Sequence, residues 1–168
     1  LNGYAMETLQ SKYIYEQERN KPMPDKFHAF IQQQLLFLIK LVYGDRFEVL
    51  PELNILFGEE KNVPDLALFE KGQLDLTYNE TNIAEIPVGA IGILSGQQPI
   101  QKLVIKLERY LNAGVKSYWL VVPDLRSIYV YHHRNDSNIF GSNDVLVDEV
   151  LGIELELQEV FGALERKG

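Results

Sequence analysis

One carboxylate and a group of basic side chains are the residues that could do chemistry. Asp65 follows a proline and opens the apolar run 66–69. Further along the chain, three basic residues recur at helical spacing: Lys102, Lys106 and Arg109. A carboxylate can hold a divalent cation that stabilises charge on phosphate oxygens and lowers the pKa of an attacking water, and a nearby lysine adds positive charge. The combination predicts a metal-dependent site for phosphodiester cleavage.

A helix and a hairpin are expected to position the carboxylate. Asp25 is suited to cap a first helix, whose apolar residues recur at helical spacing as far as Gly44. A strand over 47–57, interrupted at Pro51, and a return strand over 63–69 predict a hairpin with Asp65 in its second arm.

The lysines belong to a second predicted helix, which lies between two strands. A third strand is expected over 84–94, and the helix then runs from Pro99 to Gly114. The apolar run 117–122 is typical of a central strand covered on both faces. Further elements are expected after it: a strand over 127–132, a turn over 135–138, a strand over 145–147 and a helix over 157–164.

Length and composition indicate one ordinary globular domain. The 168 residues are 46% hydrophobic and 24% charged, which suits a domain with a buried core. We expect residues 1–24 to form an N-terminal segment, an edge strand or helical turn followed by a proline-rich linker, and residues 25–168 to form the domain. The chain has no cysteine, no signal pattern and no apolar run of membrane-spanning length. We therefore expect a cytoplasmic protein that does not enter a membrane.

The formal net charge of −8 bears on the partners. Proteins that depend on phosphate contacts usually carry a basic face, so this charge disfavours DNA as a tightly bound partner. It still leaves room for a divalent-metal nuclease, because the metal supplies part of the missing positive charge. The first helix carries more apolar residues than one buried face needs, and we therefore expect a homodimer.

The run from Lys106 to Val121 carries the most specific resemblance, and it reads KLERYLNAGVKSYWLV. Together with Pro64-Asp65-Leu66, and more loosely Leu151 to Leu155, it resembles the signature of the Uma family. These are restriction-endonuclease-like proteins of the PD-(D/E)XK nuclease superfamily. The resemblance covers most of the chain. It implies an α/β fold with a restriction-endonuclease-like core, in which helices flank a mixed central sheet.

The resemblance also assigns site residues and leaves one position empty. Asp65 matches the family's first metal-binding carboxylate, for Mg²⁺, and Lys106 matches its catalytic lysine. Gly92 stands where the family has a glutamate in a Glu-x-Leu-Ser pattern, and a water could fill the gap. We therefore expect weak or absent Mg²⁺ binding and impaired cleavage, and we expect Gly92→Glu to raise metal affinity. Glu52 could replace the glutamate only if the hairpin register brings it to Asp65.

Several alternatives remain open at this point. Asp65 could simply finish a turn, Lys106 could be a solvated helix lysine, and His28 could be a surface or capping residue rather than the histidine common in the family. For function, a metal-dependent DNA endonuclease of the Uma family competes with a non-catalytic scaffold or subunit of the same fold. An unrelated small α/β binding domain is the third reading, and it leaves the Lys106–Val121 match unexplained.

Overall fold

The structure is a computed structural model that describes residues 21–96 and 98–166, together with residues 6, 9–12, 14 and 17. The described residues ahead of residue 18 are helical, including Ser11 and Lys12. Within the predicted strand or turn over 11–16, residues 13, 15 and 16 lie outside the described residues. The division into a segment 1–24 and a domain 25–168 stays a prediction.

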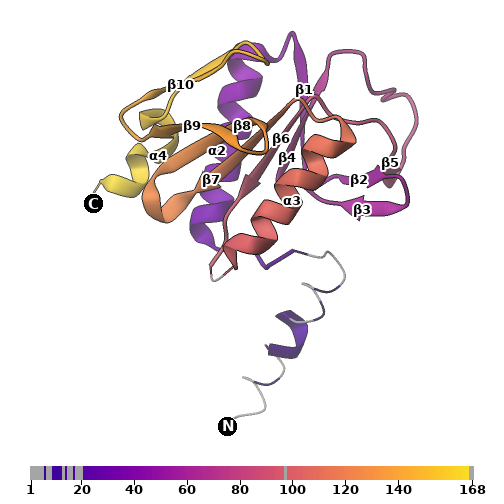
Figure 1. Ribbon diagram of the computed structural model, residues 1–168, viewed down its shortest axis with the longest axis horizontal. Coiled ribbons are helices and arrows are strands. Elements are labelled where there is room, and N and C mark those ends of the chain that lie inside the picture. Colours follow the sequence, from indigo (N-terminus) through magenta and orange to yellow (C-terminus); the bar gives the residue numbers. More distant parts are fainter. Residues whose placement is uncertain are drawn as a thin grey trace.

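A mixed six-stranded sheet runs through the centre of the described chain in the order β1-β4-β6-β7-β8-β9 (Figure 1). Within it, β6 and β7 are parallel and the other neighbours are antiparallel. Its strands are β1 (Phe47–Pro51), β4 (Leu66–Glu70), β6 (Gly89–Ile93), β7 (Ser117–Val122), β8 (Ser127–His133) and β9 (Asp136–Gly141). Parallel neighbours need a crossover connection, and helix α3 (Ile100–Ala113) supplies it. The predicted α/β fold with a mixed central sheet is confirmed.

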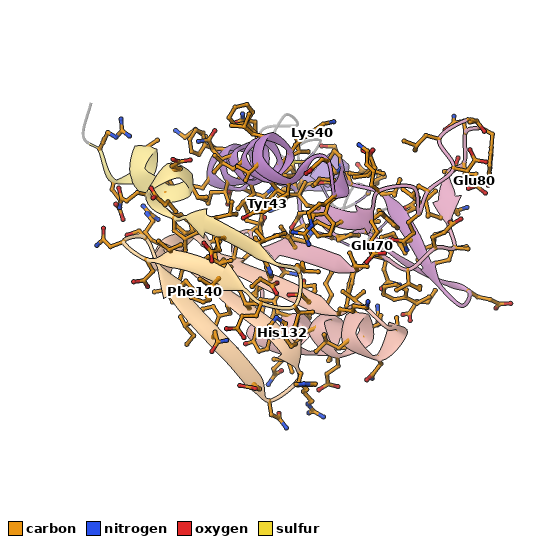
Figure 2. The ribbon with its side chains drawn as sticks, turned by 90° about the horizontal axis from the view of Figure 1, so that it is seen from above. Lys40, Tyr43, Glu70, Glu80, His132 and Phe140 are labelled. Atoms are coloured by element: carbon orange, nitrogen blue, oxygen red, sulfur yellow. The ribbon has the colours of Figure 1, made fainter. Side chains whose placement is uncertain are left out.

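Helices cover both faces of this sheet, with α2 (Lys26–Tyr43) on one side and α3 on the other (Figure 2). Successive side chains of β7 point to opposite faces of the sheet, so this strand packs against both helices. Trp119 and Val121 join the core beneath α2, whereas Tyr118 joins Leu107 and Tyr110 of α3 in a second cluster. Because both faces are covered, β7 is apolar almost throughout, as its sequence predicted.

Shorter elements surround the central sheet. The structure has a small sheet of β2 (Asn54–Phe57), β3 (Glu60–Asn62) and β5 (Asn82–Ile83), a β10 (Val145–Asp148) and β11 (Ile153–Glu156) hairpin, a 3₁₀ turn η1 (Pro123–Leu125) and helix α4 (Gln158–Glu165). Tyr43, labelled in Figure 2, ties α2 to β11, because its hydroxyl accepts from Glu154 N at 2.8 Å and donates to Glu154 O at 3.2 Å. None of the described helices is long and apolar enough to cross a membrane.

The predicted hairpin over 47–57 and 63–69 is divided differently in the structure. β1 pairs with β4, as predicted, but 54–57 leaves the central sheet and pairs with β3 instead. The break falls at Glu52, whose φ of 55° is left-handed and turns the chain after Pro51. The predicted strand 84–94 is shorter, at Gly89–Ile93. The strand predicted over 145–147 pairs with β11 rather than with the central sheet.

Candidate functional site

Asp65 lies where β4 begins, and its backbone and side chain are both tied to β6. Its backbone N donates to Ile91 O at 3.0 Å, and its Oδ2 accepts from Ile93 N at 2.6 Å. The residue is only 3% exposed. These bonds fix the carboxylate beside Gly92, which lies between the two contacted residues of β6.

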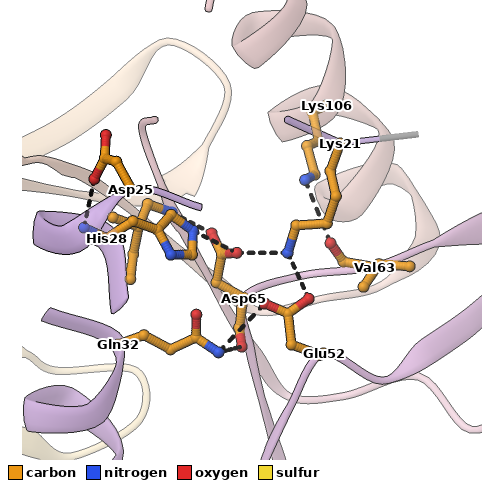
Figure 3. A network of polar contacts seen from close by, with 9 residues as sticks. Lys21, Asp25, His28, Gln32, Glu52, Val63, Asp65 and Lys106 are labelled. Carbon is orange, nitrogen blue, oxygen red and sulfur yellow. Dashed lines mark hydrogen bonds and ion pairs between the residues drawn. The ribbon is translucent and has the colours of Figure 1, made fainter. Parts of the chain in front are cut away.

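Two cationic or potentially cationic side chains meet the other carboxylate oxygen (Figure 3). Lys21 Nζ lies 2.6 Å from Asp65 Oδ1, and His28 Nε2 lies 2.9 Å from the same atom. The Asp25 side chain caps α2 by accepting from His28 N at 2.8 Å, which places His28 in the first turn, facing the sheet. Burial alone would raise the pKa of the Asp65 carboxyl, but the His28 hydrogen bond and the Lys21 charge outweigh it and hold that pKa well below its usual range.

Glu52 reaches the same ammonium from the turn after β1. Its Oε2 lies 2.7 Å from Lys21 Nζ, so two carboxylates converge on one lysine. Gln32 of α2 reinforces the arrangement, because its Nε2 donates to Asp65 O at 3.2 Å and to Glu52 Oε1 at 3.4 Å. The register therefore does bring Glu52 to Asp65, although a lysine lies between them (Figure 3).

Lys106 approaches from α3 and faces the same small cavity as Asp65. Its Nζ donates to Val63 O at 3.5 Å. Burial lowers the pKa of Lys106, and the nearby Asp65 charge offsets part of that shift. The two residues that the sequence singled out thus meet at one place, while their roles in metal binding and catalysis stay predictions.

The position of the missing glutamate is filled rather than empty. Gly92 is buried in β6, and a Cβ added there would overlap the Tyr118 hydroxyl and lie 3.2 Å from its Cζ. The cavity shared by Gly92, Tyr118, Asp65 and Lys106 holds about 10 Å³, room for about one water. Burial, followed by the Asp65 charge, raises the pKa of Tyr118, so this hydroxyl stays neutral. The Tyr118 hydroxyl takes most of the space that a side chain at position 92 would need, and the expectation that a water fills the rest stays a prediction.

The donor set does not fit a divalent metal as it stands. Within the described parts of the chain, no three histidine, aspartate or glutamate side chains are arranged to hold one. Both oxygens of Asp65 already accept hydrogen bonds, and Lys21 occupies the position between Asp65 and Glu52. Magnesium prefers an octahedron of oxygens, and an ammonium in that position excludes it.

A larger cleft of about 590 Å³ opens above this cavity and is lined by basic side chains. The cations along it are Lys12, Lys21, Lys61, Lys102, Lys106 and Arg109. Asp25 is the one acidic residue in its described lining, and its side chain already caps α2. A chain of net charge −8 therefore gathers positive charge in one concavity, next to Asp65.

Sequence reasoning missed three residues of this site, Lys21, Tyr118 and Gln32. Lys21 lies in a stretch with two prolines, which indicates a linker and gives no sign of a buried ion pair. Tyr118 lies beside Trp119 in an apolar strand, where packing is the ordinary role. Only the neighbouring glycine at position 92 pointed to an altered site, and it could not show which side chain fills the space.

A mixed central sheet flanked by helices is the architecture of a nuclease-like fold. The sequence matches the model of the Uma2 family, described as "Putative restriction endonuclease", over residues 5–158, and the chain belongs to this family. A similar solved structure is that of a protein described as a putative nuclease belonging to DUF820 from Anabaena variabilis ATCC 29413. It is 23% identical, with a TM-score of 0.74 over 85% of this chain and 84% of that one. No match was found among curated proteins.

Proposed function

We propose that this protein is a catalytically impaired member of its nuclease family that binds DNA phosphates in the cationic cleft. One observation carries the loss of cleavage. The Asp65 carboxylate is paired with Lys21, and the glutamate position is a glycine packed under Tyr118. The family and fold suggest divalent-metal use in general, whereas the donors at this site do not fit a metal.

The cleft supports the binding half of the proposal. Phosphate backbones are bound by lysine and arginine, largely through release of counterions, and binding therefore weakens steeply with salt. Lys61 and Lys102 are exposed on the cleft wall, so they can contact a strand without leaving a buried partner. The acidic remainder of the surface would limit contact to this concavity.

Cleavage is tested with supercoiled plasmid in Mg²⁺ or Mn²⁺. The parent chain should leave the plasmid intact, as should Asp65→Ala. Gly92→Glu alone should destabilise the fold because the new side chain overlaps the Tyr118 hydroxyl. Gly92→Glu combined with Tyr118→Phe removes that overlap, and metal affinity should rise when Lys21→Gln also removes the ammonium. Metal-dependent nicking by the parent that Asp65→Ala abolishes would refute the loss of cleavage.

Binding is tested by fluorescence anisotropy with a labelled duplex at two salt concentrations. Reversing the charge of Lys61 and Lys102 together should weaken binding roughly tenfold and flatten the salt dependence, since each lost phosphate contact lowers the slope by about one. Lys40→Glu with Lys116→Glu is the matched control, because both are exposed lysines outside the cleft. Equal effects of the two changes would show that the cleft is not the binding site.

A non-catalytic subunit is the second candidate, and the surface of α2 favours it. Phe37, Leu41 and Val42 are 51%, 67% and 58% exposed on this helix. Apolar side chains gathered in this way are typical of protein contacts. This role is compatible with DNA binding, because none of these residues lines the cleft.

A further inference from the structure

We infer that the Lys21 ammonium is the resident cation of this site and takes the place of a divalent metal between Asp65 and Glu52. The inference rests on the proposed loss of metal chemistry and explains what holds the two acids together without it. It also assigns a role to a residue outside the run that carries the family resemblance.

The contacts are those of a cation held by ligands rather than of a surface ion pair. Nζ lies 2.6 Å from Asp65 Oδ1 and 2.7 Å from Glu52 Oε2, so one atom bridges two carboxylates. The Lys21 side chain is 6% exposed and that of Asp65 is 4% exposed. Ionised groups buried this far need close partners, because water no longer solvates them.

The charges around the cavity are balanced without a metal. With His28 neutral, Lys21 and Lys106 supply two positive charges, while Asp65 and Glu52 supply two negative ones. A divalent cation added to this group would leave an excess of positive charge in a buried place. A carboxylate at position 92 would have offset half of that excess, and glycine provides none. Lysine at 21 and glycine at 92 are thus electrostatically consistent with each other.

The chain delivers Lys21 to this position through a short restrained connection. Pro22 and Pro24 fix two backbone φ angles between Lys21 and the start of α2. The Asp25 cap then anchors the helix start. Because few backbone rotations separate the lysine from the anchored helix, holding the ammonium in place costs little conformational entropy.

The first test measures Mn²⁺ binding from the loss of the free-ion electron paramagnetic resonance signal. The parent should show no Asp65-dependent binding at millimolar Mn²⁺. Lys21→Gln removes the ammonium, so its Mn²⁺ affinity should rise at least tenfold, and adding Asp65→Asn should abolish the gain. Lys21→Arg keeps a cation in place and should bind no better than the parent. A Lys21→Gln variant with the parent's Mn²⁺ affinity would overturn the inference.

The second test does not require the uncharged Lys21→Gln variant to fold. Nitrogen NMR of the lysine side chains should show a slowly exchanging Nζ signal that disappears in Lys21→Arg. That signal should persist unchanged in millimolar Mg²⁺, whereas its loss or shift on Mg²⁺ addition would show displacement by metal and overturn the inference. A different result would refute the proposed function. That result is plasmid nicking by the parent, and it does not depend on which metal the Lys21 variants bind.

Discussion

Replacing Asp65 by asparagine should destabilise this protein strongly. The carboxylate accepts from Lys21 and His28 on one oxygen and from Ile93 N on the other. An asparagine has one acceptor oxygen, so its amide group must face at least one of these donors. The change also leaves the buried Lys21 with Glu52 as its remaining described carboxylate partner.

The magnitude follows from these losses. A hydrogen bond to a charged group contributes about 1.5–3 kcal/mol, and breaking a buried ion pair by removing one partner costs about 3–5 kcal/mol. We therefore expect Asp65→Asn to lower the free energy of unfolding by about 3–5 kcal/mol. For a chain of this size each kcal/mol corresponds to about 2–4 °C in the midpoint temperature, so the midpoint should fall by roughly 10 °C.

Urea denaturation followed by circular dichroism measures this change. Asp136→Asn is the control, because Asp136 is an exposed aspartate at the start of β9 and its replacement should change the free energy of unfolding by less than about 0.5 kcal/mol. A metal-binding carboxylate kept for function would behave in the opposite way. Without its metal, it repels neighbouring acids, and neutralising it stabilises the fold. A free energy of unfolding that is unchanged or higher in Asp65→Asn would therefore refute the reasoning.

Three further predictions concern acid pH, a second buried aspartate and assembly. The pKa of Asp65 is lower in the folded state than in the unfolded chain, so the unfolded state binds more protons as pH falls. The free energy of unfolding should therefore be full above about pH 5 and decline below it. This decline should be smaller in Asp65→Asn. Asp148 accepts from five described donors, among them Trp119 Nε1 at 2.7 Å, so Asp148→Asn should cost about 3 kcal/mol in urea denaturation, and a cost below 1 kcal/mol would contradict this. We propose that the chain forms a homodimer through α2, so Leu41→Glu should halve the mass measured by sedimentation, and a parent that already sediments as a monomer would refute it.

The sequence predicted most of the central sheet and its two long helices, because their signals are local. Asp25 and Gly44 mark the limits of α2, and Gly114, with a φ of 107°, ends α3 as its residue type indicates. The course of the chain after Pro51 was not predictable, because a left-handed Glu52 has no signature in residue type.

The candidate site was predicted only in part for a related reason. Asp65, Lys106 and the glycine at position 92 could be matched to the family pattern, because that pattern consists of short local runs of residues. The contacts of Lys21 with Asp65 and Glu52 span 44 and 31 residues. Such long-range pairs depend on the folded arrangement of β1, β4 and the segment before α2, and no local pattern encodes them.

The packing of Tyr118 against Gly92 also constrains how this site could change over generations. A lone substitution to glutamate at position 92 collides with the phenol and places a third acid in a pocket whose charges already balance, so stability would fall before any ligand was gained. A glutamate at position 92 therefore requires a compensating change at position 118.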